Sequence, residues 1–343
     1  MTQTIKPVHE FIDALPKVEL HVHLVGSASV PTVLELARRH PDGPVPASEA
    51  ELRDFYRFRD FPHFIEVYQA VNALVRDPED VATLVLGTAR DLAAQNARYV
   101  ELTVTPHSHR LVGMAPAAVT EALDTAARQA REQHGVQMAY IFDIPAGLPG
   151  DIIGGTLDQA LNHPPEALVG FGLGGLEQAR AGHTEAIRDA FRAARAAGLR
   201  SLPHAGEMTG PETIWEAVEE LGAERIGHGL SCVQDPKLVA HLRETQIPLE
   251  VCPTSNVCTG QIPDVASHPL PTMLAEGLFV TLNSDDPPMF DTTLTGEYRV
   301  VADTFGLGRE ELAALARNAV TASSLDEKGK RAITADIDAL LAT

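Results

Sequence analysis

The sequence predicts an α/β fold in which eight parallel strands, each followed by helical sequence, close into a (β/α)8 barrel of the TIM type. Short apolar runs rich in β-forming residues alternate with longer stretches of helical period, the pattern of repeated βα units. The length of 343 residues, 44% of them hydrophobic, falls in the range of single-domain barrels. No internal repeat or low-complexity linker divides the chain. We therefore expect one domain, residues 1–343.

Eight strand-like runs can be placed in order along the chain. They are residues 18–24, 99–105, 137–144, 168–173, 199–203, 225–227, 248–251 and 278–282. Helical period and composition predict helices between them, including residues 81–96, 116–134, 184–197 and 211–221. Pro116 suits the first position of its helix, and Gly198 is a common kind of helix stop. Residues 310–320 and 326–341 predict two amphipathic C-terminal helices that pack on the barrel.

One segment interrupts this alternation between the first and second strands. A loop rich in Pro and Gly at residues 41–46 is followed by residues 48–75, in which aromatic side chains recur at roughly helical spacing. These are Phe55, Phe58, Phe61, Phe64 and Tyr68. Most of the rings are expected to pack a helical hairpin onto the barrel. Because the active site of such a barrel lies where the loops after the strands meet, the insertion at about 41–76 is predicted to cover it as a lid, with some rings lining the substrate pocket.

Composition and charge exclude several classes of protein. The formal charge of −20 argues against binding to a nucleic-acid backbone or an anionic membrane, because both need a basic surface. The three cysteines give no disulfide framework. The segment from Met1 to Lys17 contains charges and proline where a signal peptide needs a continuous apolar run, and no later run reaches membrane-spanning length. These features predict a cytoplasmic protein, and they leave its oligomeric state open.

Two histidines share one face of the first predicted strand. Since residues i and i+2 of a strand point the same way, the side chains of His21 and His23 form a pair of candidate metal ligands. Such a pair alone usually belongs to a surface face or a satisfied core. Here His204 follows the fifth strand and Asp285 the eighth, so a barrel brings all four to one mouth. Three imidazoles and a carboxylate, with a position left for water, fit Zn²⁺ and also accept Fe²⁺ or Mn²⁺.

Further polar residues at the same strand ends have the chemistry that a hydrolysis needs. A zinc ion lowers the pKa of bound water to roughly 7. His228, after the sixth strand, is predicted to take or hold the proton of that water, and Glu207, after the fifth, to protonate a ring nitrogen. Asp286 would orient a heterocycle through a hydrogen bond. Residues 170–175 contain no lysine that could be carboxylated to bridge two metals, so we expect one metal ion.

Five motifs, in order along most of the chain, resemble the adenosine deaminase family. They are LPKVELHVHL at 15–24, PHAGE at 203–207, RIGHG at 225–229, CPTSN at 252–256 and NSDDP at 283–287. The resemblance implies a zinc-dependent barrel that replaces the 6-amino group of an adenine ring by oxygen and releases ammonia. It assigns the zinc to His21, His23, His204 and Asp285, the last of which also takes part in catalysis.

The resemblance also implies a position for the adenine ring. Glu207 would protonate N1, and His228 would act on the attacking water. Asp286 would contact N7, and the backbone of Gly175 would contact N3. The Cys-ligated nucleobase deaminases carry an H-x-E motif that is absent here.

The sequence departs from the family directly after the first histidine motif. Members that act on adenosine usually have Asp-Gly there, and the aspartate binds the ribose 5′-hydroxyl; adenine-specific relatives tend to carry glutamate. This chain has Val25 before Gly26. A 5′-hydroxyl buried against valine without a partner would cost about 1–3 kcal/mol. We therefore expect a substrate that lacks a free 5′-hydroxyl and carries an apolar extension there.

An adenine nucleoside of this kind is 6-amino-6-deoxyfutalosine, a menaquinone precursor with a benzoate-containing group on its 5′ side. Val25 and the following Ser-Ala-Ser are similar to the family members that deaminate it. The lid rings would hold the benzoate ring, and its carboxylate would need a cation. Side chains of this kind are more often charged groups exposed to solvent than ligands for a carboxylate. His107 and its neighbour His109 are preferred because both lie just beyond the second strand. The full set is Arg57, Arg59, Arg76, His107 and Arg110.

Other readings of the sequence stay open. 5′-Methylthioadenosine and 5′-deoxyadenosine also lack a free 5′-hydroxyl beside Val25, and they need no cation. Adenosine itself is a further alternative. A general amidohydrolase of a cyclic amide or ester would keep the fold and metal, but replacing Glu207 with Gln should then leave much of its activity. A catalytically silent binding protein would use the metal only for structure, which intact proton-transfer groups argue against.

Overall fold

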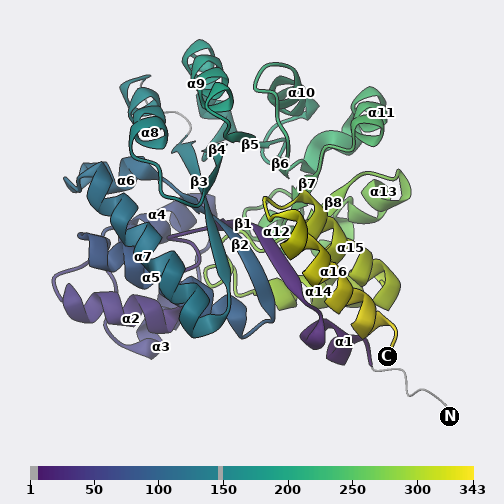
Figure 1. The fold of residues 1–343 in the computed structure, drawn as a ribbon, viewed down its shortest axis with the longest axis horizontal. Helices are drawn as coiled ribbons and strands as arrows, with labels where there is room; N and C mark the ends of the chain where they lie inside the picture. The colour runs from purple at the N-terminus through teal and green to yellow at the C-terminus, as the bar shows by residue number, and fades with distance from the viewer. Residues whose placement is uncertain (1–6, 146–149) are drawn as a thin grey trace.

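The computed structural model describes residues 7–145 and 150–343 and contains the predicted barrel (Figure 1). Eight parallel strands follow one another in sequence order around the sheet. They are β1 (Lys17–His23), β2 (Ala97–Val104), β3 (Gln137–Pro145), β4 (Leu168–Gly174), β5 (Arg200–Ala205), β6 (Ile226–His228), β7 (Leu249–Val251) and β8 (Val280–Leu282). Residues 1–6, part of the N-terminal segment considered above, and residues 146–149 lie outside the described residues.

The end of β8 returns to β1 at the level of the predicted metal ligands. The Asp285 N–H donates to the His21 carbonyl at 2.9 Å, and the His23 N–H donates to the Asp285 carbonyl at 3.1 Å. These two bonds form a parallel bridge between Val22 and Asp285. The backbone bonds that join the first and last strands therefore also fix three of the four predicted ligands.

Helices cover the outside of the strands, as βα units require (Figure 1). Those that follow β2 to β8 are α7 (Pro116–His134), α8 (Gly150–Asn162), α9 (Thr184–Ala196), α10 (Pro211–Glu219), α11 (Pro236–Thr245), α13 (Leu270–Ala275) and α14 (Leu294–Phe305). The predicted C-terminal helices are α15 (Arg309–Ala322), which contacts β1 and β8, and α16 (Glu327–Leu341). Shorter elements are α1 (Val8–Ala14), α6 (Pro106–Leu111), α12 (Pro253–Cys258) and the 3₁₀ turns Glu177–Arg180, Leu230–Gln234 and Val265–Ser267.

The predicted insertion lies between β1 and β2. α2 (Val30–Arg39) precedes it, the insertion itself contains α3 (Glu49–Phe55) and α4 (Phe61–Asn72), and α5 (Pro78–Ala93) then leads back to the sheet. The Tyr56 hydroxyl at the end of α3 donates to the Ala28 carbonyl at 2.7 Å. This bond attaches the insertion to the loop that follows β1.

Several predicted boundaries are wrong by a turn or less. The helix expected over 81–96 is α5, which begins at Pro78 because the Asp77 side chain accepts the Asp80 N–H at 3.0 Å and caps the helix there. It ends before Asn96, whose φ of 60° is left-handed. The sixth strand is shifted by one residue and includes His228.

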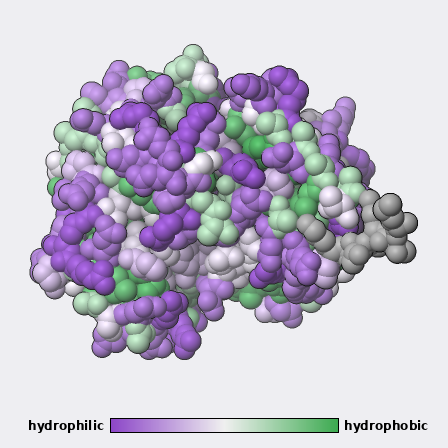
Figure 2. Space-filling view, turned by 60° about the horizontal axis from the view of Figure 1, so that its bottom comes forward, coloured by the Kyte–Doolittle hydropathy of each residue, from purple (hydrophilic) through white to green (hydrophobic). Residues whose placement is uncertain are grey.

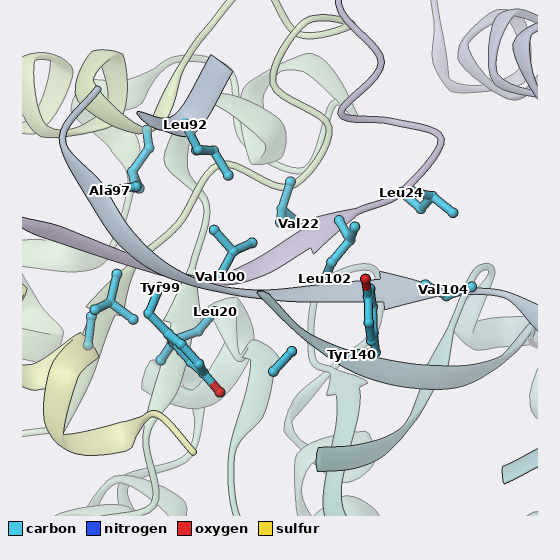
Figure 3. Packing of buried hydrophobic residues seen from close by; sticks show 14 of the residues in the cluster. Leu20, Val22, Leu24, Leu92, Ala97, Tyr99, Val100, Leu102, Val104 and Tyr140 are labelled. Carbon is cyan, nitrogen blue, oxygen red and sulfur yellow. The ribbon is translucent and has the colours of Figure 1, made fainter. Parts of the chain in front are cut away.

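Strand alternation separates an apolar outer layer from a polar barrel interior. Val22 of β1 pairs with Leu102 of β2, and both are fully buried with Val100 in the main core (Figure 3). His21 and His23 alternate with Val22 and so point to the opposite side, into the barrel.

The surface seen in Figure 2 is largely hydrophilic, with apolar side chains scattered over it. Within residues 7–145 and 150–343, no helix combines the length and the apolar character needed to cross a bilayer.

Candidate metal centre and active site

The structure brings the four predicted metal ligands together at the ends of β1, β5 and β8. One ligand atom from each of His21, His23, His204 and Asp285 lies within 4.8 Å of all the others. The Nε2 atoms of His204 and His23 are 3.3 Å apart. Asp285 Oδ1 lies 3.2 Å from His23 Nε2 and 3.6 Å from His21 Nε2. We call these four residues the metal group.

The donor atoms and spacings of the metal group fit one metal ion. Two ligands that each lie about 2.1 Å from a tetrahedral zinc ion are roughly 3.4 Å apart, which is close to the spacings above. The buried Nε2 atom of His21 has no hydrogen-bond partner among the described residues, although buried polar atoms are normally paired. A cation held by these atoms satisfies all of them at once.

Buried charged residues orient the His21 ring through the nitrogen that does not face the other ligands. Its Nδ1 lies 2.9 Å from Glu250 Oε2, so its Nε2 is turned toward the other ligands. Arg225, fully buried, pairs with Glu250 and also with Glu101 at 2.6 Å. Burial opposes ionisation of Glu250, but Arg225 and His21 outweigh it and lower its pKa to about 2. These residues were not predicted from sequence, although charged side chains inside the runs 225–227 and 248–251 are a signal that partners lie nearby.

Asp285 of the metal group and the nearby His228 have strained backbones. His228 has a φ of 61° and Asp285 a φ of 63°, values that non-glycine residues adopt rarely and mainly at functional sites. Asp285 Oδ2 accepts a hydrogen bond from the Ser255 hydroxyl at 2.6 Å, which leaves Oδ1 toward the imidazoles. His228 Nε2 lies 3.9 Å from Asp285 Oδ2 and 3.6 Å from Glu207 Oε2. Both predicted proton-transfer groups therefore lie next to the metal group.

Their environments give these two groups opposite protonation states. Burial, reinforced by the charge of Asp285, raises the pKa of Glu207 to about 8, so its carboxyl holds a proton at neutral pH. Burial and then the neighbouring His21 lower the pKa of His228 to about 3, so its imidazole is neutral. The site thus presents one proton donor and one proton acceptor side by side.

Asp286 lies beside the metal group, and one of its carboxyl oxygens is free to bind a ligand. Its Oδ1 is buried without a hydrogen-bond partner among the described residues. Burial and then the charge of Asp285 raise its pKa to about 7. A Cβ built on Gly26 would come within 1.5 Å of this oxygen, so the loop after β1 needs glycine there. An unpaired carboxyl oxygen in this position is available to a ligand.

The remaining predicted substrate contacts occupy different surroundings. Val25, directly after β1, is 5% exposed and packs in the main core, so no polar side chain stands at this position. Gly175, directly after β4, has a φ of 77° that favours glycine. His107 on α6 is half-buried, and no described contact joins it to the metal group. Its neighbour His109 is buried, with Nδ1 unpartnered among the described residues. The substrate roles of Val25, Gly175 and His107 stay predictions.

Aromatic side chains of the insertion meet the loop that follows β8. The rings of Phe58 and Phe64 pack on Phe290 at centroid distances of 5.8 and 5.0 Å. Tyr68 packs on Phe64 at 6.0 Å. Burial, and then the charge of Asp286, raise the pKa of Tyr68 well above its ordinary value. Phe290 was not found from sequence, because no pattern connects a ring in that loop to the insertion.

Comparisons with known proteins agree with this geometry. The adenosine deaminase family model matches residues 16–340. The chain belongs to the adenosine deaminase family. It is 49% identical to the aminodeoxyfutalosine deaminase of Streptomyces avermitilis, over 98% of this chain and 94% of that protein.

Solved structures extend the likeness to the whole barrel. An adenine deaminase from Arthrobacter aurescens has a TM-score of 0.90 at 29% identity, covering 96% of this chain and 100% of that one. An amidohydrolase from Burkholderia ambifaria with bound zinc has a TM-score of 0.89 at 29% identity, covering 100% and 97%. The protein is therefore an aminohydrolase with the family's barrel fold, and the bound zinc in that neighbour supports a metal centre at the metal group.

Proposed function

We propose that this aminohydrolase is a zinc-dependent deaminase of a 5′-substituted adenine nucleoside, with 6-amino-6-deoxyfutalosine as its best substrate. The observation that carries the proposal is Val25, a buried apolar side chain where members that act on adenosine are expected to place an acceptor for the 5′-hydroxyl. The 49% identity to a protein named aminodeoxyfutalosine deaminase supports the same substrate. The reaction would release ammonia and serve menaquinone synthesis in the cytoplasm.

Zinc would be held by His21, His23, His204 and Asp285. When bound, the metal supplies the Lewis acidity that makes water nucleophilic at neutral pH. Fe²⁺ and Mn²⁺ accept the same donors, so metal analysis of protein produced without added metal decides among the three.

The other polar residues would then move protons and hold the ring. Neutral His228 takes the proton of the attacking water, 3.6 Å from the Glu207 carboxyl. Glu207 gives its proton to N1, which makes C6 a better electrophile. The proton that His228 took from water then passes to the amino group, which leaves as ammonia, and the C6 hydroxyl returns a proton to Glu207. The Asp286 carboxyl, whose pKa burial raises to about 7, donates its proton in a hydrogen bond to N7, and the Gly175 N–H donates to N3. The proposal thus gives Glu207, Asp286 and Gly175 partners on the base and gives His228 the attacking water.

The 5′ substituent would lie under the lid. The bond from Tyr56 to Ala28 holds α3 against the loop that carries Val25, and the rings of Phe58 and Phe64 offer an aromatic surface for an aryl group. Among the cations considered for the carboxylate, Arg76 is paired with Asp42 at 2.8 Å.

His107 is the preferred candidate for this carboxylate. Arg57 and Arg59 are exposed, and Arg110 lies against Gly155 of α8. 5′-Methylthioadenosine and 5′-deoxyadenosine remain second candidates, because they need no cation.

A substrate panel that differs only at the 5′ carbon tests the proposal. We expect 6-amino-6-deoxyfutalosine to be deaminated with a higher kcat/KM than adenosine, followed by the ultraviolet change on loss of the amino group. Val25→Asp should raise kcat/KM for adenosine by about 5- to 150-fold, because it restores an acceptor for the 5′-hydroxyl. A wild-type preference for adenosine, or no gain from Val25→Asp, would contradict the argument.

A further inference from the structure

Asp143 is a buried carboxylate at the barrel mouth that none of these steps uses. It lies near the end of β3, is 4% exposed, and accepts a hydrogen bond from the Thr105 hydroxyl at 2.6 Å. Its other oxygen, Oδ2, lies over β4, because a Cβ built on Gly174 would come 2.8 Å from it. His23 and the lid residue Tyr68 both lie within electrostatic reach of this carboxylate. Asp143 is therefore placed among the metal group, the lid and the end of β4.

The neighbouring strand leaves room at this carboxylate. Asp143 pairs in register with Gly172, and Pro145 pairs with Gly174, so β4 contributes no side chain to this part of the interior. A buried carboxylate is costly unless donors reach it, and the Thr105 hydroxyl is its one side-chain donor among the described residues. Asp143 has the capacity to accept further hydrogen bonds from a ligand.

Strand order shows which part of the proposed substrate comes near it. In the proposed pose N1 faces Glu207 after β5, N3 faces Gly175 after β4, and N7 faces Asp286 after β8. N9 lies between N3 and N7 on the perimeter of a purine, and β3, β2 and β1 lie between β4 and β8 on the perimeter of the barrel. For a ring that lies across the mouth, the ribose on N9 therefore falls beside β1 to β3, where Val25 and Asp143 are.

We propose that Asp143 binds the 2′,3′-diol of the substrate ribose and determines specificity for a ribonucleoside. Oδ2 accepts a hydrogen bond from a ribose hydroxyl, and the Thr105 hydroxyl holds Oδ1 in place. Acidic side chains bind ribose hydroxyls in dinucleotide-binding folds by the same chemistry. The inference rests on the proposed function, because the pose of the base defines where the sugar lies.

The test compares 6-amino-6-deoxyfutalosine with its 2′-deoxyribose and 3′-deoxyribose analogues. We expect the wild type to lose about 10- to 100-fold in kcat/KM on at least one analogue, the usual effect of removing a hydrogen bond to a charged acceptor. Asp143→Ala should turn over the ribose and deoxyribose forms at similar kcat/KM. Asp143→Asn keeps the shape and a neutral acceptor, so it should retain part of the discrimination. A purely structural role would instead lower kcat/KM equally on all three substrates.

The outcomes separate this inference from the proposed function. Equal turnover of all three substrates by the wild type, or unchanged discrimination in Asp143→Ala, overturns the role of Asp143 and leaves the deaminase intact. Turnover of adenine but of none of the 5′-substituted nucleosides overturns the proposed function, and this inference with it. If Asp143→Ala does not fold, Asp143→Asn carries the comparison, and undiminished discrimination in it counts against the proposal.

Discussion

Two groups of side chains in the described part of the chain have metal-ligand chemistry, and they differ in where their bonds go. In the metal group, the His21 Nε2 has no hydrogen-bond partner among the described residues, and ligand atoms from the ends of three strands lie within 4.8 Å of one another. The second group, His40, Asp77 and Asp80, is as closely packed, but its central carboxylate is occupied. Asp80 Oδ1 accepts from Arg39 at 2.7 Å, and Oδ2 lies 2.7 Å from His40 Nε2.

The second group is explained by the start of a helix, so we call it the helix-cap group. The side chains of Asp77 and Asp80 accept one another's backbone N–H groups in a capping box at the start of α5, and the Arg76 N–H adds a third bond at 2.9 Å. The two groups contain the same kinds of residue, and in both the side chains lie close together. What distinguishes the metal group is the buried Nε2 of His21, which faces the other ligand atoms and has no hydrogen-bond partner among the described residues.

Removing an imidazole from the metal group should have the largest effect. We expect His204→Ala to lose bound metal and to lower kcat/KM on the order of 10⁴-fold, because water is then no longer activated. Metal content and deamination are measured on the same purified protein. His40→Ala, from the helix-cap group, is the matched control and should keep both. Equal metal loss in the two variants would contradict the distinction between the groups.

Glu207→Gln should separate proton transfer from metal binding. We expect kcat/KM to fall by about 10²- to 10⁴-fold with metal content unchanged, because glutamine cannot give a proton to the ring. In the wild type the carboxyl, whose pKa burial raises to about 8, is protonated below that pH, so kcat/KM should decline as pH rises past 8. Activity that persists in Glu207→Gln would favour a general amidohydrolase.

Arg225→Met should weaken metal binding without removing a ligand. Arg225 fixes Glu250, which fixes His21, and loss of such outer partners typically costs about 10- to 100-fold in metal affinity. Chelator competition measures the dissociation constant, and Arg225→Lys should recover part of it. Arg200→Met is the matched control, because Arg200 bonds the same Ala322 carbonyl at 2.8 Å but its described hydrogen bonds do not include Glu250. Equal metal affinity in the Arg225→Met and Arg200→Met proteins would show that the buried charged residues do not act on the metal.

His40→Ala should have the smallest effect on function. We expect the free energy of unfolding to fall by about 1–3 kcal/mol, because the buried Asp80 loses a hydrogen bond, and kcat/KM to stay unchanged. Chemical denaturation with a parallel activity assay measures both quantities. A lower kcat/KM with intact stability would mean that the helix-cap group affects the site in a way that the fold does not explain.

Residues that directly follow the strands of a parallel barrel meet at one end of it, and this regularity accounts for what could be predicted from sequence. His204 and Asp285 follow recognisable apolar runs, and parallel strands bring their carboxyl ends to one mouth, so their meeting with His21 required no coordinates. Arg225 and Asp143 were not found, because each lies inside a run whose inward face is defined only once strand register is known.

The insertion at residues 41–76 shows the same limit of sequence reasoning. Its aromatic spacing predicted helices, but the ring that completes the cluster, Phe290, comes from a loop far away in the chain. Helical period reports which residues share a face of one segment, and it contains no information about the segment that covers that face.

Because of the bridge between Val22 and Asp285, a bound ion would also affect the stability of the fold. An ion bound by His21, His23 and Asp285 is held by both edges of the sheet at once, and these edges come from opposite ends of the chain. Since the unfolded chain offers no such assembled site, the free energy of metal binding is added to the stability of the closed circle of strands. A cell short of the metal would then lose enzyme through unfolding and proteolysis, as well as turnover by each molecule that remains.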